Sequence, residues 1–184
     1  MCAVEISNEI KTRIHDFLKR GFYPHYNHLK QSFPSDPKWM KFNQLGTDLW
    51  LDSGNINEIA NQWTQEFSAL TVNNSLLNKE IQAGTYDSLI PEILDLFQDS
   101  HNLSTKQLLL EISFCLNAWH GMRLVEKFDA YISLELHTDL ADDPDLTVNY
   151  AKRFYAVCPE RFCIKIPFTP AGLLAARKLV KQGV

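Results

Sequence analysis

The stretch Phe162-Cys163-Ile164-Lys165-Ile166-Pro167-Phe168-Thr169-Pro170 decides the expected fold, because it places a lysine inside a short apolar strand and then begins a helix. A short apolar run followed directly by Thr-Pro is typical of a buried strand, a tight turn and a helix with Thr169 as its N-cap and Pro170 in its first turn. We therefore expect Lys165 near the carboxyl end of its strand.

Two interpretations of Lys165 stay open from this stretch alone. A buried ammonium group is costly to desolvate, so it either finds a partner or loses its proton more readily, and the neutral amine is a nucleophile toward carbonyl carbons. Alternatively, the lysine lies on an edge strand, where its charge discourages pairing with another chain.

The composition of the whole chain predicts one globular unit with a single core, since its 184 residues are 45% apolar and 22% charged. The net charge is −4 and the basic residues are scattered, so neither nucleic acid nor an anionic membrane surface is an expected partner. No stretch approaches the length of a transmembrane helix, and the start of the chain lacks the order of a signal peptide. We expect a soluble, cytoplasmic protein.

The cysteines do not predict a metal site. Cys2, Cys115, Cys158 and Cys163 include no C-x-x-C pair, and no histidine stands at zinc-ligand spacing from them. Cys163 lies two residues before Lys165 and hence on the same face of the strand, where it is either a small core side chain or a reactive thiol.

Residues 1–45 are expected to form a helical N-terminal extension. Apolar side chains recur at spacings of three and four over residues 4–20, as on one face of an amphipathic helix, and Gly21 is the expected stop. Asp36-Pro37 then begins a short helix that ends near Gly46.

Residues 46–184 alternate between strands and helices. This alternation predicts right-handed crossovers, a parallel sheet and the α/β class. No glycine-rich phosphate loop follows any strand, which disfavours the nucleotide-binding versions of the class. We expect strands at residues 47–52, 69–72, 129–136 and around Lys165, and helices at residues 55–67, 75–82, 86–98, 104–127, 143–158 and 169–182.

Three of the expected strands have one aliphatic face and one polar face, because successive side chains of a strand point to opposite sides. In a doubly wound sheet, helices cover both faces, and both are nearly continuously apolar. In a barrel, helices cover only the outside, and the inner face can turn polar at the carboxyl ends of the strands, where barrel active sites lie. The pattern therefore favours a barrel. The polar faces carry Asp48, Trp50 and Asp52, then Ser133, Glu135 and His137, then Cys163, Lys165 and Pro167.

Four strand-end motifs resemble those of the transaldolases, which are class I aldolases on a TIM (β/α)₈ barrel with a Schiff-base lysine on the fourth strand. Each motif alone is weak, but all four occur in barrel order, and the resemblance covers roughly residues 45–184. The motifs are Leu49-Trp50-Leu51-Asp52-Ser53, Leu70-Thr71-Val72-Asn73-Asn74-Ser75-Leu76 (the family has Thr-Thr-Asn-Pro-Ser-Leu), Ile132-Ser133-Leu134-Glu135-Leu136, and Ile164-Lys165-Ile166-Pro167-Phe168-Thr169 (the family has Ile-Lys-Ile-Pro-Ala-Thr).

The resemblance implies a set of site residues. Lys165 would be the Schiff-base nucleophile, Glu135 would activate a water, and Asp52 would exchange a proton with a substrate hydroxyl. The substrates would be sugar phosphates of the pentose phosphate pathway, and no metal or organic cofactor is implied. Substrate binding would fall to Thr71, Asn73 and Ser75.

Each implied site residue also has a structural alternative. Asp52 would suit the N-cap of the following helix. Glu135 would suit an ion pair with Lys165 on the adjacent strand, which need not exclude a catalytic role. Asn73 is a favoured turn residue. His137 is either a general base or a polar side chain at the rim of the barrel.

The chain departs from the family pattern in two ways. Asn74 stands where the family usually has proline, and the loss of proline's fixed φ is expected to loosen the turn there. A barrel of this type needs about 250 residues, so residues 46–184 are expected to form only its first four strand–helix units. The family's later strands supply a threonine, a serine and phosphate-binding arginines that this chain has no positions to match.

Two classes of function therefore remain. The first is transaldolase-like transfer of a dihydroxyacetone unit, in a site completed by a second copy or by a complementing half-barrel. The second is a truncated, catalytically inactive half-barrel whose exposed strand edges make it self-associate. A fructose-6-phosphate aldolase-like enzyme is the near alternative, although those relatives have glutamine where Glu135 stands. We expect little or no sugar transfer by the isolated chain.

Overall fold

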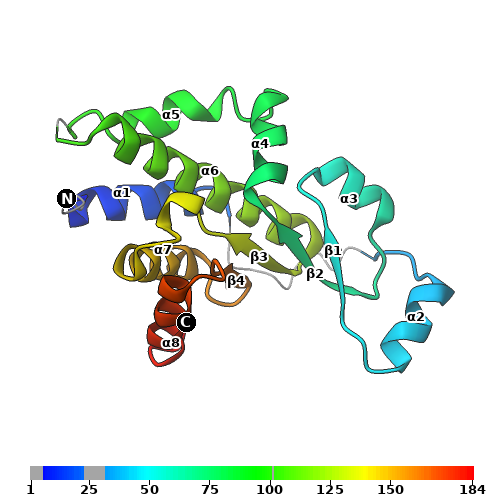
Figure 1. Cartoon of the computed structure of the whole chain (residues 1–184). Coiled ribbons are helices and arrows are strands. Elements are labelled where there is room, and N and C mark those ends of the chain that lie inside the picture. The colour runs from blue at the N-terminus through cyan, green and yellow to red at the C-terminus, as the bar shows by residue number, and fades with distance from the viewer. Residues whose placement is uncertain (1–5, 23–31, 101) are drawn as a thin grey trace.

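Four parallel strands form the centre of the molecule (Figure 1). The computed structural model describes residues 6–22, 32–100 and 102–184, so Cys2 lies outside the described residues. Each neighbouring pair of strands is parallel, and the order in the sheet is the order in the chain. The predicted α/β class is confirmed. The strands are β1 (Leu49–Asp52), β2 (Phe67–Val72), β3 (Tyr131–Glu135) and β4 (Phe162–Lys165).

Helices precede, connect and follow the strands, and side-chain caps predicted from the sequence begin several of them. Ser104 and Gln107 form a reciprocal capping box, and Asp36, Asn55 and Asp143 each accept hydrogen bonds from backbone N–H groups of the turn they begin. The helices are α1 (Asn8–Lys19), α2 (Pro37–Gln44), α3 (Ile56–Gln62), α4 (Asn74–Gln82), α5 (Leu89–Asp95), α6 (Thr105–Phe128), the 3₁₀ helix η1 (Thr138–Leu140), α7 (Pro144–Val157) and α8 (Pro170–Val180).

The boundary between α3 and β2 differs from the expected one. The helix ends at Gln62 instead of near residue 67, and the strand begins at Phe67. The buried Glu66 accepts hydrogen bonds from the Ser35 hydroxyl and the Asp36 N–H, so the chain leaves the helix to bring this carboxylate to those donors. Burial opposes the charge of Glu66, but these hydrogen bonds outweigh it and lower the pKa to about 2.

The helix expected at residues 86–98 is shorter, because α5 begins only at Leu89. Tyr86 lies before it, buried, with its hydroxyl 2.5 Å from Nδ1 of His120 in α6. Burial lowers the pKa of His120 to about 4 and raises that of Tyr86 to about 12, so the pair is neutral near pH 7. A local sequence pattern does not reveal this partner, 34 residues away.

The two faces of the sheet differ as the alternation predicted. On one face, Leu70, Ile132 and Leu134 are fully buried; on the other, Trp50 and Tyr131 are 49% and 47% exposed. Paired residues of neighbouring strands share a face. We call the first the covered face (Leu51, Leu70, Val72, Ile132, Leu134, Phe162 and Ile164) and the second the open face (Trp50, Asp52, Ala69, Thr71, Tyr131, Ser133, Glu135, Cys163 and Lys165).

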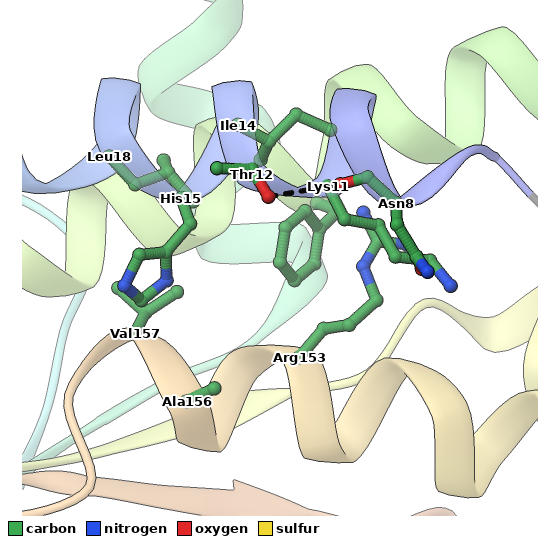
Figure 2. Close-up of a pocket in the computed structure, with 10 residues that line it drawn as sticks. Asn8, Lys11, Thr12, Ile14, His15, Leu18, Arg153, Ala156 and Val157 are labelled. Atoms are coloured by element: carbon green, nitrogen blue, oxygen red, sulfur yellow. Dashed lines mark hydrogen bonds between the residues drawn. The ribbon is translucent and has the colours of Figure 1, made fainter.

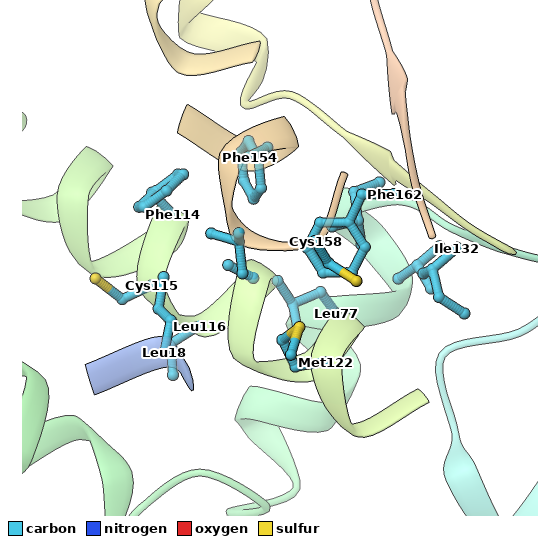
Figure 3. Packing of buried hydrophobic residues seen from close by; sticks show 14 of the residues in the cluster. Leu18, Leu77, Phe114, Cys115, Leu116, Met122, Ile132, Phe154, Cys158 and Phe162 are labelled. Atoms are coloured by element: carbon cyan, nitrogen blue, oxygen red, sulfur yellow. The ribbon is translucent and has the colours of Figure 1, made fainter. Parts of the chain in front are cut away.

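Helix α6 packs closely against the covered face, and Figure 3 shows Met122 of this helix among the side chains that pack near Ile132 and Phe162. Gly121 makes the close approach possible, since a Cβ at this position would come within 2.9 Å of the Phe162 ring and 3.0 Å of Leu134 Cδ1. The apolar core therefore lies between the covered face of the sheet and the helices, and the open face lies outside this core.

A second helical layer strengthens this side of the molecule. Helix α1 lies beside α6 and α7 in Figure 1 and contacts both. Its Phe17 ring lies 5.4 Å from that of Trp119, and Arg20 pairs with Glu92 of α5 at 2.7 Å.

The division of the chain into two parts near residue 45 stays a prediction. In the described part of the chain, no helix is both long and apolar enough to span a membrane.

A buried ion pair joins α6 to α7. Glu111 is 4% exposed, and its carboxylate accepts hydrogen bonds from the Arg153 guanidinium at 2.8 and 2.5 Å and from the Tyr150 hydroxyl at 2.6 Å. The guanidinium also lies 4.2 Å from the centre of the Phe114 ring. Burial opposes the charge of Arg153, but its bonds to Glu111 outweigh this and raise its pKa. Both oxygens of the buried carboxylate are thus hydrogen-bonded, and both donor residues, Tyr150 and Arg153, lie on α7.

Candidate active site

The acidic and basic side chains of the open face lie at the carboxyl ends of the strands. Asp52 is paired in register with Thr71, and Glu135 with Lys165. Thr71 in turn is paired with Ser133, two residues before Glu135. Because paired residues and residues two apart share a face, the structure places Asp52, Thr71, Glu135 and Lys165 on the same face of the sheet, at the carboxyl ends of its four strands.

Asp52 is exposed at the end of β1 and is oriented by β2. The Thr71 hydroxyl donates a hydrogen bond to Asp52 Oδ1 at 2.7 Å. Asn55 is the N-cap of α3, with its Oδ1 accepting from the N–H groups of Asn57 and Glu58 at 3.0 Å. The alternative of Asp52 as a helix cap is therefore wrong.

Glu135 and Lys165 are strand neighbours, yet no ion pair joins them among the residues that the structure describes. Glu135 Oε2 instead accepts hydrogen bonds from the backbone N–H and the side-chain Nδ2 of Asn74, at 3.0 and 3.1 Å. The alternative of a structural Glu135–Lys165 ion pair is wrong, and both groups are half-buried at the end of the sheet.

The turn from β2 to α4 carries the predicted substrate-binding residues. Asn73 is the N-cap of α4, since its Oδ1 accepts from the Leu76 N–H at 2.9 Å. This confirms the turn role of Asn73 and leaves its side-chain nitrogen outside the cap. Ser75 is exposed in the first turn of the helix. Asn74 was expected to loosen the turn, but it ties the turn to β3 through its bonds to Glu135 and to the Leu136 carbonyl.

Sequence reasoning missed two residues that hold Glu135. Asn74 was noticed only as a departure from proline, although the change itself signalled a new donor. Asn117 of α6 donates from Nδ2 to the Glu135 carbonyl at 3.0 Å and is 5% exposed. The sequence feature that points to Asn117 is its polar amide within the apolar run Cys115-Leu116-Asn117-Ala118. A buried amide is costly unless it is hydrogen-bonded, so a long-range partner was to be expected there.

His137 lies just beyond β3 and caps η1. Its Nδ1 accepts a hydrogen bond from the Asp139 N–H at 3.2 Å and lies 3.9 Å from the Asp139 carboxylate. This position agrees with a polar side chain near the strand end, and it directs one ring nitrogen to a turn and away from the Glu135–Lys165 pair.

The turn that follows Lys165 is tightly built. Thr169 caps α8, accepting from the Gly172 N–H at 2.9 Å, and donates to the Ala141 carbonyl at 2.6 Å. A Cβ on Gly172 would lie 1.9 Å from the Pro167 carbonyl oxygen, so only glycine permits this approach. The predicted cap is confirmed. In the described sheet β4 pairs with β3 alone, so Lys165 also lies on an edge strand.

Two hollows lie on the helical side of the molecule. One, of about 340 Å³, lies between parts of α1 and α7. Figure 2 shows His15 reaching from α1 toward Val157, and Arg153 reaching from α7. The other, of about 390 Å³, lies between α4, α6 and α7 and has Asn74 and Ser75 in its wall. Neither is lined by the carboxylates or the lysine of the open face.

Over residues 6–22, 32–100 and 102–184, no group of three or more His, Cys, Asp and Glu side chains is arranged to hold a metal ion. Burial raises the pKa of the Cys163 thiol, which makes the nucleophilic thiolate scarcer than at an ordinary cysteine.

The chain is an α/β protein with a parallel sheet, and a lysine and two carboxylates lie at the carboxyl ends of its strands. The sequence model described as Transaldolase/Fructose-6-phosphate aldolase matches residues 49–184, which include all four strands. The chain belongs to the transaldolase/fructose-6-phosphate aldolase family.

Curated relatives agree at low identity. Transaldolase 2 of a Nostoc species is 26% identical over 79% of this chain and 40% of its own length. A transaldolase of Xanthomonas euvesicatoria is 30% identical over 62% of this chain and 37% of its own length. A transaldolase of Mycobacterium tuberculosis is 26% identical over 81% of this chain and 42% of its own length. The matched part of the chain thus spans about two fifths of these relatives.

Proposed function

We propose that this chain carries the Schiff-base half of a transaldolase-like transferase, with strands β1 to β4 as the first four strands of a (β/α)₈ barrel. The observation that carries the proposal is the position of Asp52, Glu135 and Lys165, which all lie on the open face at the carboxyl ends of their strands. Barrel enzymes place their catalytic groups at the carboxyl ends of the strands. Membership in the family supports sugar phosphates as substrates.

Lys165 is the nucleophile in this proposal. Its neutral amine attacks the C2 carbonyl of a ketose phosphate such as fructose 6-phosphate, and the carbinolamine loses water to give an iminium ion. The iminium accepts the electron pair of the C3–C4 bond as that bond breaks. An enamine of dihydroxyacetone remains on Lys165 until an aldose phosphate such as erythrose 4-phosphate accepts it.

The two carboxylates move the protons. Asp52, held by Thr71, takes the proton of the C4 hydroxyl as glyceraldehyde 3-phosphate leaves, and returns a proton to the new hydroxyl in the transfer step. Glu135 acts through a water on the carbinolamine oxygen, a general acid–base contribution of about 10²–10⁴ in rate. The Asn73 amide nitrogen donates to the dihydroxyacetone unit, with Thr71 and Ser75 beside it.

Two alternatives differ from this proposal, one in whether a completed site is active and the other in the reaction that the site performs. The half-exposed Trp50 and Tyr131 and the single pairing of β1 and β4 favour association of the open face with a second copy or a complementing half-barrel. Such an assembly is either an active site or an inert contact. A fructose-6-phosphate aldolase-like enzyme would cleave the substrate without passing the unit to an acceptor; Glu135 favours the transferase.

Borohydride trapping tests the proposal. Incubation with fructose 6-phosphate and borohydride, followed by peptide mass spectrometry, is expected to give a reduced adduct on Lys165. Lys165→Ala removes the adduct completely, whereas Lys152→Ala, at an exposed lysine of α7, keeps it. An adduct that survives in Lys165→Ala, or none at any ketose phosphate concentration in the unaltered chain, contradicts the proposal.

A further inference from the structure

Asn74 connects the start of α4 to the end of β3 by several hydrogen bonds. Its backbone N–H and its Nδ2 both donate to Glu135 Oε2, at 3.0 and 3.1 Å, and Nδ2 also donates to the Leu136 carbonyl at 3.0 Å. We infer that Asn74 is a positioning residue, which acts on the proton transfers at Lys165 through Glu135. The inference rests on the function proposed above and adds a residue to that site.

The two donors converge on one oxygen of the carboxylate. They leave Glu135 Oε1 outside the contact with Asn74, while Asn117 Nδ2 holds the Glu135 main-chain carbonyl at 3.0 Å. A free glutamate side chain samples several rotamers. The two bonds from Asn74 select one of them, and the bond from Asn117 fixes the backbone that carries the side chain. Oε1 is thereby left as the oxygen that exchanges protons with the water.

The same bonds keep Glu135 away from the amine. Glu135 and Lys165 are paired in register on neighbouring strands, the arrangement in which opposite charges usually meet. A carboxylate in contact with an ammonium group favours the charged form, which is not a nucleophile. Asn74 holds the carboxylate toward the start of α4, in a position where it forms no ion pair with Lys165, and this leaves the amine able to attack a carbonyl.

The fold does not need an asparagine at this position. Asn74 is the first residue of α4, where proline is well tolerated, and Asn73 has φ −122° and ψ 167°, the extended conformation that precedes proline. Proline lacks both the N–H and the side-chain amide. Asn74→Pro therefore removes every bond to Glu135 and retains the backbone path, which separates positioning from folding.

Trapping rates in single and double variants test the inference. We measure the rate of Lys165 adduct formation at saturating fructose 6-phosphate and the half-saturating concentration, for Asn74→Ala and Asn74→Pro, each with Glu135 or Glu135→Gln. Asn74→Ala keeps the backbone donor and is expected to lose about threefold in rate, and Asn74→Pro about tenfold, since small misplacements of catalytic groups cost up to ~10² in rate. The half-saturating concentration is expected to stay the same, because the substitutions act on the proton transfers and not on substrate binding.

In the Glu135→Gln background, the Asn74 substitutions are expected to have no further effect, because the carboxylate that they position is gone. Equal losses in both backgrounds, or an unchanged rate in Asn74→Pro, overturn the inference. Thermal unfolding of each variant checks the fold, and Asn74→Ala serves as the test if the proline variant does not fold.

A measurement without catalysis separates this inference from the proposed function. The amide resonance of Asn74 in a ¹H–¹⁵N spectrum is expected to move upfield in Glu135→Gln, because a charge-assisted bond is replaced by a neutral one. An unmoved resonance overturns the contact itself. If the resonance moves but the unaltered chain forms no adduct, the proposed function fails, and the catalytic part of the inference fails with it.

Discussion

The covered and open faces belong to the same four strands, yet different interactions hold them. Ile132 and Leu134 of the covered face are fully buried against α6, whereas Tyr131 and Trp50 of the open face are about half exposed. Burial of apolar side chains stabilises the fold, whereas burial of charged groups destabilises it unless they stay hydrated or paired. Stability therefore comes mainly from the covered side of the sheet and the candidate chemistry from the open side, so substitutions on the two sides should have separable effects.

The largest expected difference in the free energy of unfolding is between substitutions of two basic residues. Arg153→Ala removes the partner of the buried Glu111 and is expected to lower the free energy of unfolding by about 3–5 kcal/mol, because it leaves an uncompensated buried charge. Lys165→Ala, on the open face, is expected to stay within about 0.5 kcal/mol of the unaltered chain. Urea unfolding followed by circular dichroism measures both. Similar losses at the two positions would show that the open face also stabilises the fold.

Two neighbours on β3 give the next contrast. Ile132 is fully buried on the covered face, and Ile132→Ala is expected to cost about 3–4 kcal/mol through lost burial and the cavity left behind. Tyr131→Ala, on the open face, is expected to cost below about 1 kcal/mol, the usual range for a half-exposed side chain without a buried partner. Urea unfolding of both variants at one pH measures the two free energies of unfolding, and equal m-values make them comparable. A reversed order would contradict the assignment of the two faces.

His120 gives the covered side a pH dependence. Its pKa is about 4 in the folded protein and 6.5 ordinarily, so the unfolded chain binds more protons between these values. Stability is therefore complete above about pH 6.5 and falls by on the order of 3 kcal/mol as the pH drops to about 4. His120→Gln should flatten this slope, whereas His137→Gln near the open face should leave it in place. A slope that persists in His120→Gln would assign it to other groups.

A smaller loss of stability is expected from a change at Gly121. Gly121→Ala places a methyl group against Phe162 and Leu134, and overpacking of this kind costs about 1–3 kcal/mol. Leu109→Ala, at a 58% exposed position of the same helix, should change stability by less than about 0.5 kcal/mol. Thermal unfolding distinguishes the two variants. A stabilised Gly121→Ala would mean that α6 can move away from the sheet at no cost.

Glu66 extends the pH comparison into the acid range. Its pKa of about 2 lies below its ordinary 4.5, so it adds stability that is present above about pH 4.5 and is lost as the pH falls toward 2. Glu66→Gln is expected to weaken the acid dependence in this window and to leave the window of His120 unchanged. Acid unfolding curves measure this, and an identical acid midpoint would contradict it.

The strand faces and the helix starts could be predicted because they depend on neighbours in the sequence. Alternation along β3 separated Ile132 from Ser133, and cap residues such as Ser104 and Thr169 marked where helices begin. The end of α3 could not be predicted, because Glu66 finds its donors at Ser35 and Asp36, about 30 residues earlier in the chain. Propensity gives way where a buried polar group needs a distant partner.

For the candidate site, position along each strand was enough to predict which side chains share the open face at the strand ends, since side-chain direction in a strand follows position. The contacts of these side chains depend on how the helices pack around the sheet. Glu135 bonds to Asn74, 61 residues away in the chain, and not to its strand neighbour Lys165. The physical reason is that two converging donors on a helix start compete for the carboxylate, and their position depends on how α4 packs beside β3.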